Sequence, residues 1–321
     1  MARDRYLQAI RGLAIACVVC IHCLPQCAAS VVLRPFLNWA VAGFLFLSGL
    51  LTSESKILKG GGLAKRLHKV LIPYLVWSGI YLVVTQRLTA GGIVKGVLFG
   101  TSSAQMYYLL VYAQLVVLTP LLYRALRSHC LLVYCVTPVF LLVREIAVIV
   151  GVALPQVQVL FPAWLLFYVL GLDWGKVGRA ATRRCSLLPG LLVACLFLQL
   201  VSGFAWLARG DYNMATTQLK LSSMATSAVL VVLIGLTGHR LRQLFARSHL
   251  VKLGDLSFGI YLCHILVLSV VTKVLGFVAI PPLMATVVNL AVTLVVSACV
   301  VCCGSYAAAA QSMRSAWFCL A

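Results

Sequence analysis

Ten long apolar stretches are the feature that most constrains the fold of this chain. A helix that crosses a bilayer needs about 20 predominantly apolar residues, and each stretch is 17 to 24 residues long. Only 10% of the residues are charged and 63% are hydrophobic, which is too little charge for the surface of a soluble domain. We therefore predict an all-α, polytopic integral membrane protein with about ten transmembrane helices. The predicted spans are residues 10–29, 37–53, 70–88, 105–123, 130–150, 159–175, 187–207, 217–237, 254–277 and 282–305.

The basic residues predict the orientation of these spans. An even number of spans puts both termini on one side, and 18 of the 26 Lys and Arg residues then fall on that side, with seven on the other. The excess indicates that both termini are cytoplasmic. The net charge of +20 comes from short clusters between apolar runs, not from one stripe. We therefore expect a multi-pass protein of the cell (cytoplasmic or inner) membrane, with the bilayer and no nucleic acid as its partner.

The chain reads as a single transmembrane domain over residues 1–321, without an internal repeat or an appended soluble domain. A signal peptide over residues 1–29 is an alternative, because a basic start and an apolar core precede small residues. A histidine interrupts that core, so we expect the segment to be retained as the first span. No feature of the sequence indicates an oligomeric state.

Four cysteines near the N-terminus have a spacing found in iron–sulfur proteins. Cys17, Cys20, Cys23 and Cys27 spell C-x2-C-x2-C-x3-C, as at a ferredoxin cluster. The residues between them include Val18, Val19, Ile21 and Leu24, which are apolar and suit a helix, on which Cys17 and Cys27 would lie about 15 Å apart. No proline follows the fourth cysteine. We expect small packing residues here and no metal site.

Arg11 and His22 lie inside the first predicted span. Eleven residues make three helical turns plus roughly 20°, so both side chains share one face, about 16 Å apart along the axis. An ionisable residue within a span marks a functional site by default. We expect Arg11 at the cytoplasmic edge and His22 deep in the bilayer, where an imidazole can take a proton near neutral pH. The alternatives are an arginine that snorkels to the interface and a histidine that pairs with another helix.

Six motifs follow one another along the chain. The first is RYLQAIRGLAIACVVCIHC, in which ten residues separate an arginine from a histidine. The others are VAGFLFLSGLL (41–51), KRLHKVLIPYLVW (65–77), MYYLLVYAQLVVLTPLL (106–122), LLFYVLGLDWGK (165–176) and LGDLSFGIYLCHIL (253–266). In this order, on ten predicted spans, they resemble the membrane-bound acyltransferase-3 family, of the O-antigen acetylase type.

The resemblance implies transfer of an acyl group, commonly acetyl from acetyl-CoA, to a sugar hydroxyl outside the cytoplasm. Acetyl is the family default and succinyl is the alternative. Arg11, Arg66 and Lys69 would bind the phosphates of CoA. His22 would act as general base, with a covalent acyl-histidine as the less favoured route. The acceptor would be a surface glycan or a lipid-linked saccharide.

Further candidates for substrate binding come from the same motifs. Ser48, Tyr108 or Ser257 would stabilise the oxyanion of the transition state. Tyr261 and His264 belong to the late motif, and His264 alternatively packs against a polar neighbour.

The chain departs from the family pattern in two places. Lys69 stands where the second arginine is usual, which keeps the charge but loses the bidentate fork. Tyr107 and Tyr108 replace the usual tryptophan, and Gln105 stands where a histidine often precedes it. These departures concern CoA binding and acceptor contacts rather than the fold.

A transporter or flippase that uses Arg11 and His22 as a polar relay is the rival class. Such relays favour paired carboxylates, and only Glu145 lies well inside a predicted span. Arg144 and Glu145 would form a structural ion pair near the outer end of their span or contact the acceptor. A non-catalytic scaffold would tolerate the loss of His22.

Overall fold

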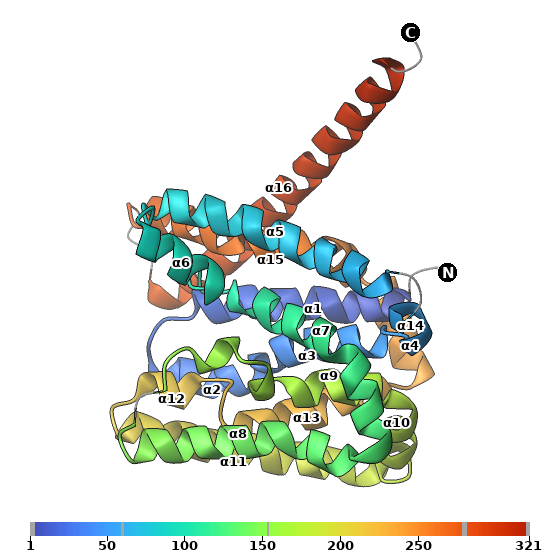
Figure 1. The fold of residues 1–321 in the computed structure, drawn as a ribbon. Coiled ribbons are helices and arrows are strands. Elements are labelled where there is room, and N and C mark those ends of the chain that lie inside the picture. The colour runs from blue at the N-terminus through green and yellow to red at the C-terminus, as the bar shows by residue number, and fades with distance from the viewer. Residues whose placement is uncertain (1–3, 59–60, 153, 278–280, 319–321) are drawn as a thin grey trace. The chain divides into compact units, whose positions relative to one another are not determined.

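The structure is a computed structural model that describes residues 4–58, 61–152, 154–277 and 281–318. All regular secondary structure in these ranges is helical (Figure 1). The chain divides into two compact units, which we describe separately. The first unit contains residues 1–25 and 243–321, and the second unit contains residues 26–242.

The first unit is built from three long helices. These are α1 (Arg5–Cys23), α15 (Leu250–Leu275) and α16 (Pro282–Phe318), while α14 (His239–Arg247) crosses the boundary between the units. Helix α1 packs most extensively against α15, and both contact α16. At the start of α1 the guanidinium of Arg5 donates to the carbonyl of Ala246 at 2.9 Å.

The ends of α1 differ from the prediction for physical reasons. The Asp4 carboxylate accepts the backbone N–H groups of Tyr6 and Leu7, so the helix begins five residues earlier than expected. It ends at Cys23, and Leu24 continues with an extended backbone. The predicted helix from 10 to 29 is therefore wrong at both ends.

The end of α1 at Cys23 separates the fourth cysteine of the motif from the other three. Cys17, Cys20 and Cys23 lie on α1, but Cys27 is the N-cap of the next helix, so the four do not share one helix. All four are free thiols. Within the described ranges, no group of three or more His, Cys, Asp or Glu side chains is arranged to hold a metal ion.

The second unit holds the remaining helices. In chain order they are α2 (Ala28–Leu37), α3 (Trp39–Leu50), α4 (Glu54–Leu58), α5 (Gly62–Val84), α6 (Ala90–Leu98), α7 (Tyr107–Ser128), α8 (Cys130–Ile149), η1 (Val157–Val159), η2 (Phe161–Ala163), α9 (Leu165–Leu172), α10 (Trp174–Thr182), η3 (Cys185–Leu187), α11 (Leu188–Ala208), α12 (Tyr212–Thr216) and α13 (Leu221–Leu236). Helix α3 lies mainly against α9 and contacts α13 as well.

Nine segments of the described chain are long and apolar enough to cross a membrane, which confirms an all-α polytopic membrane protein. They are Arg5–Cys23, Ala28–Leu50, Gly62–Val84, Tyr107–Ser128, Cys130–Ile149, Cys185–Ala208, Tyr212–Leu236, Leu250–Leu275 and Met284–Gly304. The second combines α2 and α3, so it begins nine residues before the predicted span at 37.

The predicted span over residues 159–175 has another form. Two 3₁₀ turns, η1 and η2, precede the eight-residue helix α9, which is too short to cross a bilayer alone. Side chains of neighbouring helices bind the freed backbone groups. Gln114 on α7 donates to the carbonyl of Val159 at 2.7 Å and accepts the N–H of Phe161 at 3.0 Å. Thr137 on α8 donates to the carbonyl of Pro162 at 2.7 Å and accepts an N–H in the first turn of α9 at 2.9 Å.

Candidate functional site

Two imidazoles meet in the first unit. His22 lies in the last turn of α1 and is partly exposed, whereas His264 lies within α15 and is fully buried. Their ring centroids are 5.3 Å apart and the ring planes are inclined by 49°. The predicted general base therefore lies beside one of the predicted substrate-binding residues.

The hydrogen bonds of His264 define its tautomer. Its Nδ1 lies 2.8 Å from the carbonyl oxygen of Tyr261 and 3.1 Å from that of Ile260. Carbonyl oxygens only accept hydrogen bonds, so Nδ1 carries the proton. The buried Nε2 has no hydrogen-bond partner among the described residues. In the neutral ring Nε2 is consequently an acceptor, and it can take a proton or an N–H hydrogen bond.

Helices α1 and α15 come into backbone contact at two glycines. A Cβ atom added to Gly12 would lie 2.1 Å from the carbonyl oxygen of Leu250, and one added to Gly254 would lie 1.8 Å from that of Gln8. No side chain fits at either position without a shift of the helices. This contact fixes the pairing of the two helices that carry His22 and His264.

The other candidates of the first unit lie on the same two helices. Arg11 precedes Gly12 and is partly buried, in the second turn of α1, three turns before His22. Ser257, Tyr261 and His264 follow at helical spacing on α15 and are buried. The ring centroid of Tyr261 lies 5.8 Å from that of His264. The structure thus brings His22, Tyr261 and His264 together.

Arg66 is the centre of a second cluster, in the second unit. Its Nε donates to the hydroxyl of Tyr112 at 2.7 Å, and one terminal nitrogen donates to the carbonyl oxygen of Ser48 at 3.0 Å. The other terminal nitrogen donates to the hydroxyl of Thr52. The guanidinium also lies 5.6 Å from the centre of the Tyr112 ring. These bonds hold Arg66 at the C-terminal end of α3.

The remaining candidates of the second unit surround this cluster. Tyr108 stacks on Tyr112 with ring centroids 6.2 Å apart and planes inclined by 5°. Lys69 lies one turn beyond Arg66 on α5 with an exposed side chain. Ser48 contacts Arg66 through its carbonyl oxygen, not its hydroxyl.

Sequence reasoning missed Thr52 and Tyr112, which bind Arg66. Tyr112 lies four residues after Tyr108, so helical periodicity was a usable signal. Thr52 follows the end of α3, and its hydroxyl donates to Ser48 while its carbonyl accepts from Tyr123. No local pattern indicated that role.

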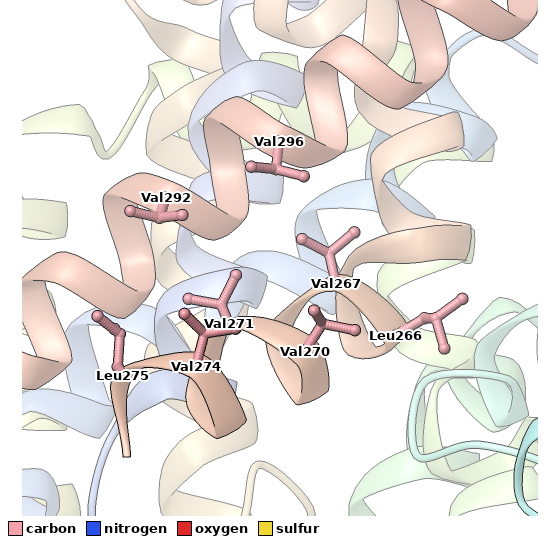
Figure 2. Close-up of a pocket in the computed structure, with 8 residues that line it drawn as sticks. All are labelled: Leu266, Val267, Val270, Val271, Val274, Leu275, Val292 and Val296. Atoms are coloured by element: carbon pink, nitrogen blue, oxygen red, sulfur yellow. The ribbon is translucent and has the colours of Figure 1, made fainter. Parts of the chain in front are cut away.

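Figure 2 shows an apolar groove between α15 and α16. Its eight lining residues are all aliphatic, and they begin at Leu266, two residues after His264. The volume is about 380 Å³. No side chain that lines it can hold a phosphate or a sugar hydroxyl, so the groove contributes no group to the chemistry.

The fold and these clusters define a polytopic membrane protein with a pair of imidazoles, one of them buried, in one unit and an anchored arginine in the other. A family model described as "Acyltransferase domain" matches residues 4–306. The chain therefore belongs to the acyltransferase-3 family, and the resemblance inferred from the six motifs is confirmed. A search of curated proteins and a search of solved structures each gave no match.

Proposed function

We propose that this membrane acyltransferase transfers an acetyl group from acetyl-CoA to a hydroxyl of an extracytoplasmic glycan or lipid-linked sugar. The family supplies the reaction class. The observation that carries the proposal is the contact between His22 and His264, whose tautomer leaves Nε2 as an acceptor. A pair of imidazoles in contact is suited to taking and passing on a proton.

In the proposed reaction His22 removes the proton of the acceptor hydroxyl as general base. The hydroxyl oxygen attacks the thioester carbonyl, a C–O bond forms and the C–S bond breaks. The proton held by His22 then goes to the CoA thiolate. Tyr261, Ser257, Ser48 and Tyr108 remain candidates for contacts with the substrates, and succinyl-CoA remains the alternative donor.

Arg11, Arg66 and Lys69 are the proposed ligands of the CoA phosphates. Arg66 carries five N–H donors, and its bonds to Tyr112, Ser48 and Thr52 use three of them. The remaining donors of a guanidinium held in this way suit a phosphate, because little side-chain freedom is lost on binding.

The proposal is tested with purified protein in lipid nanodiscs. Hydrolysis of radiolabelled acetyl-CoA and equilibrium binding of CoA are measured for the wild type, His22→Ala and Arg11→Ala. His129→Ala is the matched control, because this histidine is exposed between α7 and α8.

We expect His22→Ala to bind CoA without turnover, Arg11→Ala to bind CoA weakly, and His129→Ala to match the wild type. Turnover by His22→Ala at the wild-type rate would contradict the role of His22. Absence of binding of any acyl-CoA to the wild type would contradict the donor and favour a transport path through Arg11 and His22. Label that stays on the protein after rapid denaturation near neutral pH and is lost on acidification would indicate the acyl-histidine route, because acyl-imidazoles are labile in acid.

A further inference from the structure

Helices α12 and α13 are separated by four residues without helical structure, Thr217–Lys220, which we call the α12–α13 break. The break lies inside the apolar segment Tyr212–Leu236, where the sequence predicted a continuous helix from 217 to 237. Non-helical backbone at membrane depth persists only where it is buried in protein or lines a polar space. The backbone N–H and C=O groups of the break must therefore find hydrogen-bond partners within the protein or in such a space.

Helix α8 binds the break with its two charged residues. Arg144 donates to the carbonyl of Leu219 at 2.5 Å, and the carboxylate of Glu145 accepts the first N–H of α13, from Leu221, at 3.2 Å. Lys220 is only 1% exposed, and its ammonium donates to a carbonyl of α12 at 2.9 Å. The structure thus assigns both Arg144 and Glu145 to the backbone of the break.

The amide of Asn38, at the start of α3, is oriented by the same backbone. Its Nδ2 lies 3.2 Å from the carbonyl oxygen of Thr216 and 3.5 Å from that of Thr217. Only the nitrogen can face two carbonyls, so the assignment of nitrogen and oxygen is determined. Oδ1 then faces the other way, buried and without a hydrogen-bond partner among the described residues.

The amide of Gln199 on α11 is fixed by a chain of two hydrogen bonds. The hydroxyl of Ser223 donates to the carbonyl of Thr217 at 2.9 Å, so its oxygen must accept from Nε2 of Gln199, at 2.8 Å. Oε1 of Gln199 is left without a partner among the described residues, and the side chain is only 2% exposed. A second buried acceptor is therefore unsatisfied at the same break.

The two amides belong to one cluster. Asn38 and Ser223 both reach the carbonyl of Thr217, and Ser223 binds Gln199. Gly203, one turn after Gln199, also faces the break, because a Cβ atom there would lie 3.8 Å from the ammonium nitrogen of Lys220. Three helices, α3, α11 and α13, thus contribute to a buried cluster in which two amide oxygens have no hydrogen-bond donor among the described residues.

We propose that the buried polar cluster around the α12–α13 break, with Asn38, Gln199 and Lys220, is the binding site for the saccharide acceptor. Hydroxyl groups of a sugar donate to Oδ1 of Asn38 and Oε1 of Gln199, and the remaining N–H donors of Lys220 bind sugar oxygens. A phosphate offers acceptors and few donors, so it would leave both amide oxygens unsatisfied. The inference rests on the proposed function for the class of acceptor, but the hydrogen bonds that carry it are independent of His22.

The decisive variants replace glutamine by methionine, which has a similar shape and no amide. Gln199→Met removes an unsatisfied oxygen, whereas the matched control Gln114→Met removes an amide whose nitrogen and oxygen are both bonded to backbone. Lys220→Met provides a second variant at the break. The probes are the methyl glycosides of glucose, galactose and N-acetylglucosamine, added to the full-length protein in nanodiscs.

Two quantities are measured: the change in Tm with each glycoside, and transfer of label from acetyl-CoA to it. We expect Gln199→Met and Lys220→Met to need at least a tenfold higher glycoside concentration for the same rise in Tm and the same transfer of label. Gln114→Met should begin from a lower Tm and keep the wild-type response. An unchanged response in both variants at the break would overturn the site.

A different result would separate this inference from the proposed function. If the wild type hydrolyses acetyl-CoA but no glycoside raises its Tm or accepts label, water is what satisfies the two amides and the saccharide site is overturned. If acetyl-CoA is not turned over while a glycoside still binds and Gln199→Met abolishes that binding, the proposed donor fails and the site stands.

Discussion

The helix pairs α1–α15 and α3–α9 use the same packing device, each within its own unit. In the first, Gly12 and Gly254 allow backbone contact. In the second, a Cβ atom on Gly49 would lie 2.2 Å from the carbonyl oxygen of Tyr168, and one on Gly171 would lie equally close to that of Phe46. Small residues that let two backbones approach are typical of helix pairs in membranes, where lipid gives little drive for association.

The polar groups beside the two contacts differ. On α15, the buried Nε2 of His264 has no hydrogen-bond partner among the described residues, and the ring lies beside that of His22. Next to α3, by contrast, Arg66 is bonded to the carbonyl of Ser48 and the hydroxyl of Thr52. The first pair keeps an atom available for chemistry, and the second uses its polar groups to hold a cation. Mutations of these polar groups should therefore affect activity beside the first contact and both stability and CoA binding beside the second.

The largest effect is expected for His22→Ala. Loss of a general base typically costs about 10²–10⁴-fold in turnover, while the partly exposed side chain at the end of α1 contributes little to packing. Acetyl-CoA turnover and Tm are measured on the same preparation. A fall in Tm as marked as that of a core mutant would break the comparison, because His22 would then be structural.

The next effect concerns Arg66→Met in the second unit. This variant loses three hydrogen bonds and leaves the part-buried hydroxyl of Tyr112 without its donor, while the carbonyl of Ser48 keeps only the hydroxyl of Thr52. Each buried group left unsatisfied costs about 1–3 kcal/mol of unfolding free energy. We expect a lower Tm together with weaker binding of CoA. Wild-type Tm with weak CoA binding would show that the bonds of Arg66 are not structural.

Substitutions of the glycines compare the two helix contacts directly. Gly12→Ala and Gly49→Ala each place a methyl group against backbone, which should cost about 1–3 kcal/mol of stability. Gly79→Ala on α5 and Gly190→Ala on α11 are the controls, because a Cβ atom there meets open space. Thermal unfolding in nanodiscs is the measurement. Equal Tm values for all four variants would refute close packing at both contacts.

The smallest effect concerns the connection that joins α1 to α2. The backbone N–H and the hydroxyl of Ser30 hold the pKa of the Cys27 thiol below its usual value. More thiolate is therefore present at neutral pH, and a maleimide should react readily with this exposed cysteine. Ser30→Ala raises the pKa and should slow alkylation at pH 7 by roughly two- to threefold. The rates should converge well above both pKa values, and a constant ratio at all pH values would contradict this cause.

Much of the fold could be predicted from hydropathy, because apolar length alone identifies a membrane span. The start of α1 was missed since its first turn contains Arg5 and Gln8, which lower hydropathy but do not disfavour a helix. Asp4 was a usable cap signal. The interruption before α9 was not predictable in this way, because Gln114 and Thr137 act from other helices.

The candidate site was predictable to a similar degree. The late motif contains Tyr261 and His264, and the first motif contains His22, so both histidines of the pair were predicted as site residues from the sequence. Their contact depends on the pairing of α1 with α15, which lie about three quarters of the chain apart in sequence, and no local pattern encodes it. The partners of Arg66 depend in the same way on where α3 ends.

The interrupted segment before α9 has a consequence for how the protein is made. Residues 157–172 cannot enter lipid alone, because their free backbone groups would lack partners. The two side chains that supply those partners, Gln114 and Thr137, lie earlier in the chain and leave the ribosome first. Biogenesis therefore follows the order of synthesis: α7 and α8 form the receiving surface, and the irregular segment inserts against protein instead of lipid.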